Sequence, residues 1–189
     1  MGRFLSEAEI IELRPRAEIR FLREVAGPEH GGPCLEAFYR FYEELHPTHF
    51  EGIYEGVPEL LRELRARELP LGLVTGKSRR SWEITRRHVD LGPFHVEVMD
   101  DDVPRQKPDP AGVLRALRSL EAPPERVVYV GDSLTDMEAA KEAGIRAAAV
   151  LWCKKEEERA LFREAAEGLG AEIVPTPGSL ARILGAAPV

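Results

Sequence analysis

The sequence predicts an α/β protein with a three-layer parallel-sheet core and a small helical module at its N-terminal end. From about Gly56 onward, short apolar segments alternate with segments of helical periodicity, the pattern of parallel strands joined by crossover helices. Before that point the apolar residues keep helical spacing and show no strand pattern. We therefore divide the chain into a helical module, residues 1–54, and an α/β core, residues 55–189.

The composition limits the kind of protein this is. Hydrophobic residues make up 43% and charged residues 31%, as in soluble globular proteins, and no apolar run is long enough to span a bilayer. Acidic residues near the N-terminus argue against a signal peptide, and two cysteines are too few for a disulfide framework, so we expect a cytoplasmic protein. A net charge of -7 argues against nucleic acid or an anionic membrane as partner.

The predicted elements follow from periodicity and punctuation. In the module, helices are expected with breaks near Pro15, residues 27–33 and Pro47, and its aromatic residues are expected to pack between helices. In the core, strands are predicted over 71–75, 95–99, 127–130, 147–151 and 172–174. The helices between and around them are predicted over 58–67, 78–89, 109–120, 134–143, from 154 onward, and 179–184.

Residues 127–144, VVYVGDSLTDMEAAKEAG, carry the strongest functional signal. They read as a buried strand, a turn and a helix, with Asp132 directly after the strand and Asp136 in the first helical turn. Capping alone favours Asp at a helix N-terminus, but a second carboxylate at the same turn adds repulsion that a divalent cation would relieve. Ligands of parallel α/β sheets bind beyond the carboxyl ends of the strands. We therefore treat Asp132 and Asp136 as candidate ligands of a hard cation.

Two other loops are expected at the same edge. Thr75 ends a predicted strand, and Gly76 with Ser78 leads into a helix whose N-terminus suits phosphate. Lys107 lies in the loop after the next strand, where it offers a positive charge. A cation, a hydroxyl and a carboxylate pair on successive loops are the parts needed for phosphoryl transfer. The run 100–102, three aspartates, is expected to form a solvated loop.

These residues carry a family resemblance. VTGKS with Thr75, QKPDP with Lys107, and VGDSLTD with Asp132 and Asp136 resemble, in order, the second, third and fourth motifs of the haloacid dehalogenase superfamily of phosphohydrolases. The N-terminal module resembles the helical cap of phosphoglycolate-phosphatase-like members. The resemblance implies a Rossmann-like core and Mg²⁺-dependent hydrolysis of a small phosphorylated metabolite, a phosphate monoester, through an aspartyl-phosphate.

The resemblance also implies roles for individual residues. Asp132 and Asp136 would hold Mg²⁺, Thr75 and Lys107 would contact the transferring phosphoryl group, and the backbone of Gly76 would support it. The family's first motif, an Asp-x-Asp that follows the first strand and supplies the nucleophile, has no counterpart here. We therefore expect the chain as given to lack the covalent step.

The absent first strand has a consequence for the sheet. In the family it lies between the strands that correspond to 71–75 and 127–130. Its absence leaves two unpaired inner edges, and we expect the gap to be filled by direct pairing of these strands, by a strand from a neighbouring chain, or by an upstream segment of the natural protein, which we favour. For the chain as given we expect marginal stability and a tendency to form homo-oligomers through those edges.

Two other functions compete with this interpretation. The letters GDSL at 131–134 match the nucleophile block of a family of serine esterases, but the last histidine, His95, precedes Ser133, so no base follows it. A relative that binds phosphate and metal without catalysis is the stronger alternative, because it needs no nucleophile.

Overall fold

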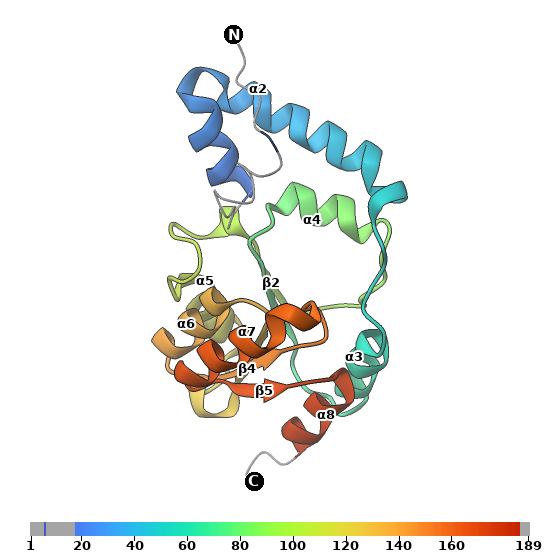
Figure 1. The fold of residues 1–189 in the computed structure, drawn as a ribbon, viewed down its shortest axis with the longest axis vertical. Helices are drawn as coiled ribbons and strands as arrows, with labels where there is room; N and C mark the ends of the chain where they lie inside the picture. Colours follow the sequence, from blue (N-terminus) through green and yellow to red (C-terminus); the bar gives the residue numbers. More distant parts are fainter. Residues whose placement is uncertain (1–5, 7–17, 186–189) are drawn as a thin grey trace.

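The fold is that of a computed structural model, which describes residue 6 and residues 18–185 (Figure 1). Its helices are α2 (Glu18–His49), α3 (Val57–Ala66), α4 (Arg79–Arg86), α5 (Ala111–Leu120), α6 (Leu134–Glu142), α7 (Glu156–Gly168) and α8 (Pro177–Gly185), with short 3₁₀ turns η1 (Asp100–Asp102) and η2 (Pro124–Arg126). Its strands are β1 (Gly72–Val74), β2 (Val96–Val98), β3 (Val128–Gly131), β4 (Arg146–Val150) and β5 (Glu172–Val174).

The N-terminal helical segment is broken where the sequence suggests a break over residues 27–33. α2 contains one non-helical residue, Gly27, with φ 73° and ψ 174°, a backbone conformation that glycine adopts without steric cost. The segment is helical again through Pro33 and past Pro47, and it ends at His49, close to the second expected break. The break expected at Pro15 lies outside the described residues.

All strand pairs among the described residues are parallel, but they form two separate sheets. β1 pairs with β2, and β4 lies between β3 and β5. The hydroxyl of Tyr129 on β3 lies 3.2 Å from the Val74 carbonyl on β1, so a side chain connects the two sheets where no strand pairing is recorded in the described part of the chain. The separation expected between these inner strands is therefore observed.

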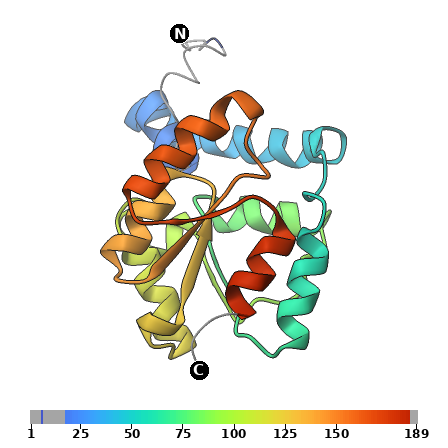
Figure 2. The ribbon, with the colours of Figure 1, turned by 60° about the horizontal axis from the view of Figure 1, so that its bottom comes forward.

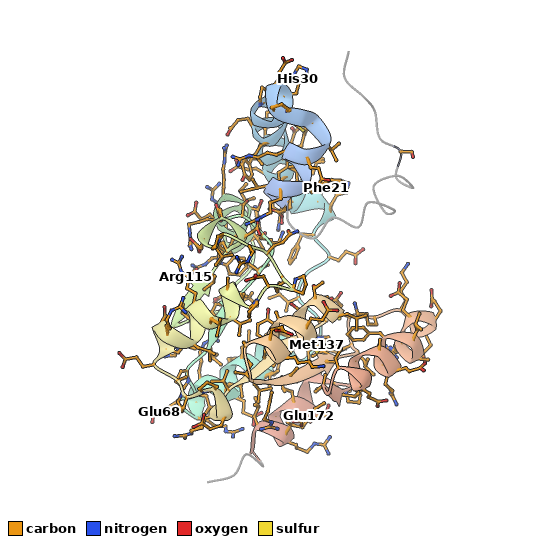
Figure 3. The ribbon with its side chains drawn as sticks, turned by 90° about the vertical axis from the view of Figure 1, so that its left-hand side faces the viewer. Phe21, His30, Glu68, Arg115, Met137 and Glu172 are labelled. Carbon is orange, nitrogen blue, oxygen red and sulfur yellow. The ribbon has the colours of Figure 1, made fainter. Side chains whose placement is uncertain are left out.

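The larger sheet is covered on both faces, which gives three layers (Figure 2). On β4, Ala147 and Ala149 belong to a core cluster with residues of α5, α6 and α7. The alternate positions, Ala148 and Val150, pack with residues of α3 and α8. Met137 of α6 is fully buried in the first cluster (Figure 3). The three-layer prediction is confirmed, because successive strand residues point to opposite faces.

α2 packs across α4 rather than on the sheet (Figure 1). Tyr42 of α2 lies 2.8 Å from the Thr85 hydroxyl of α4, and Arg80 pairs with Glu36 at 2.8 Å. Tyr39 is buried in this contact, as expected of a helix-packing aromatic, whereas Phe41 is half exposed. No helix in the described part of the chain combines the length and apolar character required to cross a membrane.

Candidate active site

The loops that follow β1, β2 and β3 carry the site residues expected from the sequence. The loop after β3 is held by a capping box: Ser133 Oγ accepts from the Asp136 N–H at 3.2 Å, and the Ser133 N–H donates to Asp136 Oδ2 at 3.1 Å. A Cβ at Gly131 would lie 2.5 Å from the Asp136 Cβ, so only glycine allows this close approach. The identities of Gly131 and Ser133 therefore follow from the close packing and the capping of this turn.

Asp136 and Lys107 form the tightest ion pair of the site. Lys107 Nζ donates to Asp136 Oδ1 at 2.6 Å, and the Asp136 side chain is only 5% exposed. Ser133 Oγ donates to the other carboxylate oxygen at 2.7 Å, and the Tyr129 hydroxyl lies 3.2 Å from Oδ1. Burial alone would raise the pKa of the Asp136 carboxyl, but Lys107 and Ser133 outweigh it and hold that pKa below its usual value.

These contacts give Asp136 different partners from those we expected. Both carboxylate oxygens already accept hydrogen bonds from protein groups, and the Lys107 ammonium supplies the positive charge that we assigned to a cation. The partners differ because Lys107, 29 residues earlier in the chain, reaches the first turn of α6, a contact that the sequence does not show. The arrangement makes Asp136 a positioning partner of Lys107.

Asp132 is the more exposed of the two candidate carboxylates. Its side chain is 57% exposed and pairs with Lys154 Nζ at 3.4 Å. Within the described residues no group of three or more histidine, cysteine, aspartate or glutamate side chains converges as a metal site would. The described residues thus supply one exposed carboxylate, which does not by itself fit a tightly held Mg²⁺. Metal binding at Asp132 stays a prediction.

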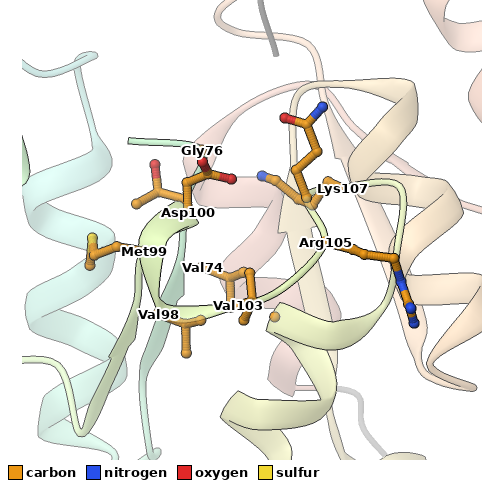
Figure 4. A pocket seen from close by; sticks show the side chains of 11 residues that line it. Val74, Gly76, Val98, Met99, Asp100, Val103, Arg105 and Lys107 are labelled. Atoms are coloured by element: carbon orange, nitrogen blue, oxygen red, sulfur yellow. The ribbon is translucent and has the colours of Figure 1, made fainter. Parts of the chain in front are cut away.

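Thr75, Gly76 and Lys107 line one small cavity of about 20 Å³ (Figure 4). Thr75 Oγ1 accepts from the Lys77 N–H at 3.2 Å, so the hydroxyl proton can be donated to a ligand. Two of the three ammonium protons of Lys107 have partners in Asp136 and, at 3.4 Å, Tyr129. The structure thus brings together the residues predicted to bind phosphate, although they come from loops about 30 residues apart.

The N-terminus of α4, expected to suit phosphate, faces a carboxylate of the same chain. Ser78 N–H and Oγ donate to Glu18 Oε2 at 3.1 and 3.2 Å, and Lys77 Nζ lies 3.4 Å from Glu18 Oε1. Arg20, two residues further along α2, donates to the Val103 carbonyl at 3.0 Å. The first turn of α2 therefore contacts the loop after β1 and the loop after β2.

Sequence comparisons address what kind of protein has these loops. A family model described as haloacid dehalogenase-like hydrolase matches residues 4–150. The chain belongs to this family. Pyrophosphatase PpaX of Bacillus cereus is 35% identical over 125 residues, which are 64% of this chain and 58% of that protein. N-acetylmuramic acid 6-phosphate phosphatase of Pseudomonas aeruginosa is 38% identical over 119 residues, 62% of this chain and 52% of that protein.

Two further relatives agree with the family. Phosphoglycolate phosphatase of Pseudomonas syringae is 34% identical over 117 residues, 61% of this chain and 42% of that protein. The crystal structure of CbbY from Rhodobacter sphaeroides in complex with phosphate has a TM-score of 0.74 at 26% identity, covering 94% of this chain and 81% of that chain. The likeness confirms the Rossmann-like α/β fold of haloacid dehalogenase-like hydrolases. This chain spans about half the length of the curated relatives it matches.

The structure adds site residues that the sequence did not single out. Asp100, expected in a solvated loop, is only 4% exposed and lines the same cavity as Thr75, Gly76 and Lys107, so that expectation is wrong. It is buried because its N–H donates to the Lys77 carbonyl and its carboxylate faces Arg20 at 3.6 Å. Burial raises the pKa of Asp100, against the opposing effect of Arg20. A run of three aspartates gives no signal that its first member is buried.

Ser133 has a structural part in this family member rather than that of an esterase nucleophile. Its hydroxyl accepts from the Asp136 N–H and donates to the Asp136 carboxylate. A serine whose hydroxyl oxygen accepts from the backbone N–H of the third helical residue is an N-cap. The GDSL match therefore reflects the capping box.

Proposed function

We propose that this chain forms the phosphoryl-binding part of a phosphatase that hydrolyses a small phosphate monoester. The proposal is supported mainly by one observation: Thr75, Gly76 and Lys107 line a common cavity at the carboxyl ends of β1 and β2. Relatives that bear the names pyrophosphatase and 6-phosphate phosphatase cleave bonds to phosphorus, which agrees with a phosphoryl group as the shared ligand.

Each residue has a distinct part in the proposal. The Thr75 hydroxyl and the Gly76 N–H would donate to phosphoryl oxygens, and the remaining ammonium proton of Lys107 would neutralise charge that builds up on them. Asp136 would hold Lys107 in place, because its carboxylate fixes the ammonium at 2.6 Å. These parts bind and orient the phosphoryl group.

The proposal also covers the metal and the attack on phosphorus. We propose Mg²⁺ as the cofactor, with Asp132 as a ligand, and weak binding in this chain, because Mg²⁺ keeps several waters and demands near-octahedral geometry. The nucleophile would be the first aspartate of the family's Asp-x-Asp motif, which has no counterpart in this sequence. The alternative is a chain that binds phosphate without turnover, because binding needs no nucleophile.

The test is calorimetric titration of the chain with inorganic phosphate. We expect Thr75→Val to weaken binding by about tenfold to a hundredfold, since a hydrogen bond to a charged group contributes about 1.5–3 kcal/mol. Thr48→Val, which removes an exposed hydroxyl from α2, is the matched control and should bind like the parent. Equal affinities of the two variants would refute the phosphate site, and turnover of a monoester panel by the parent would exclude the binding-only alternative.

A further inference from the structure

Two buried oxygen atoms of the phosphate cavity have no hydrogen-bond donor among the described residues. They are Asp100 Oδ1 and Gln106 Oε1, and both side chains line the cavity with Thr75 and Lys107. Buried acceptors without a donor are rare in native proteins and point to a water, ion or ligand that belongs beside them. The cavity therefore has an acceptor side as well as a donor side.

Asp100 is a fixed acceptor rather than a mobile surface group. It is 4% exposed, and its N–H donates to the Lys77 carbonyl at 3.0 Å. Its other carboxylate oxygen faces Arg20 Nε at 3.6 Å, which leaves Oδ1 directed elsewhere. Figure 4 shows Asp100 and Lys107 extending toward one another, while Arg105 points away. Asp100 thus lines the same cavity as the lysine that we expect to contact phosphate.

The volume of the cavity and the hydrogen-bonding character and charge of its lining limit which group can satisfy the two acceptors. A cavity of about 20 Å³ admits a group the size of one water molecule, so it would take the hydroxyl alone, and the phosphoryl group would contact Thr75, Gly76 and Lys107 from outside it. Asp100 Oδ1 and Gln106 Oε1 only accept hydrogen bonds, so the group must donate, and a second anion is excluded. Lys107 and Arg20 already supply two positive charges nearby, so a neutral hydroxyl fits better than an ammonium.

We infer that Asp100 and Gln106 form an acceptor subsite that takes a substrate hydroxyl lying close to the phosphoryl group, with a single water in its place in the free protein. This inference rests on the proposed phosphate site and narrows its substrate to a hydroxylated phosphate monoester. The subsite would distinguish such esters from their deoxy analogues, because only the hydroxyl ester replaces the water by a donor that is tethered to the bound phosphoryl group.

The test compares two esters that differ in one hydroxyl. The full chain is titrated calorimetrically with ethyl phosphate, 2-hydroxyethyl phosphate and 2-aminoethyl phosphate. We expect the hydroxyl ester to bind about fivefold or more tightly than ethyl phosphate, as one net buried hydrogen bond provides. In Asp100→Leu this ratio should fall to about one, whereas Asp101→Leu, at the exposed neighbour, should keep the parent ratio.

A second variant keeps the test decisive if Asp100→Leu does not fold. Gln106→Leu removes the other acceptor and should lower the same ratio. Equal binding of the two esters, with inorganic phosphate still bound, would overturn the subsite alone and leave an ordered water as its permanent occupant. Tightest binding of the amino ester would overturn the hydroxyl assignment. Loss of binding for every phosphate ligand would instead overturn the phosphate site, and the subsite with it.

Discussion

Removal of the Lys107 ammonium should destabilise the fold far more than its position in a loop suggests. The Lys107→Met substitution keeps most of the side chain's volume but leaves the Asp136 carboxylate, 5% exposed, without its cation. Breaking a buried ion pair by removal of one partner costs about 3–5 kcal/mol. Ser133 and Tyr129 still donate to Asp136, and Lys107 is partly exposed, so we expect about 3 kcal/mol at neutral pH.

A double variant separates this explanation from simple loss of packing. In Lys107→Met with Asp136→Asn no charge remains buried, so the double variant should be more stable than Lys107→Met alone. The matched control is Lys154→Met, whose partner Asp132 is largely exposed, and it should cost no more than about 1 kcal/mol.

Urea unfolding followed by circular dichroism measures all three variants. In the parent, the folded pKa of Asp136 lies below its usual value, so its contribution is present above about pH 4 and is lost as the pH falls further. Lys107→Met should therefore lose its penalty at low pH, where Asp136 becomes protonated. The reasoning is refuted if Lys107→Met costs no more than Lys154→Met, or if the double variant is the less stable of the two.

Three further predictions concern other parts of the molecule. His46 is 6% exposed, and neither of its ring nitrogens has a hydrogen-bond partner among the described residues. Burial, His88 and Lys77 lower its pKa in the folded state, so the unfolded chain binds the proton more readily. The free energy of unfolding should therefore fall as the pH drops below about 6.5. His46→Phe should flatten this slope in urea midpoints from pH 7.5 to 5.5, and an unchanged slope would exclude His46. Lys154→Met should raise Mg²⁺ affinity severalfold in calorimetry by freeing Asp132, whereas parent-like Mg²⁺ affinity in Asp132→Ala would place the cation elsewhere. Light scattering should show concentration-dependent association through the unpaired edges of β1 and β3, and a strict monomer with a high melting temperature would contradict it.

Much of the fold could be predicted because its pattern is local. The alanine-rich run at 147–151 is buried, and β4 is the middle strand of its sheet, as its composition predicts. The run at 127–130 was also expected to be buried on both faces, but that expectation is wrong, because β3 lies at the edge of its sheet and Val130 is 39% exposed. The break expected over residues 27–33 is found at Gly27, whose positive φ suits glycine, whereas Pro33 lies within a helical turn. Glycine was therefore a better guide to the break in this segment than proline.

The candidate site was predictable only where a residue directly follows a strand. Thr75 and Asp132 were placed by that rule, and Lys107 by its loop between a strand and a helix. The partners of these residues depend on contacts between distant segments, such as Asp136 with Lys107. Sequence spacing therefore indicated which side chains meet at the sheet edge, but not which of them neutralise one another.

The cavity's affinity for phosphate is tested most directly by a titration of the ¹⁵N-labelled chain with inorganic phosphate, followed by amide shifts in two-dimensional NMR. If Thr75, Gly76 and Lys107 bind the phosphoryl group, their amide signals shift together and saturate with one dissociation constant, while that of Lys141, exposed on α6, stays in place. Shifts confined to a different basic region, such as Arg86 and Arg87 at the end of α4, or no saturable shift at all, would contradict the account.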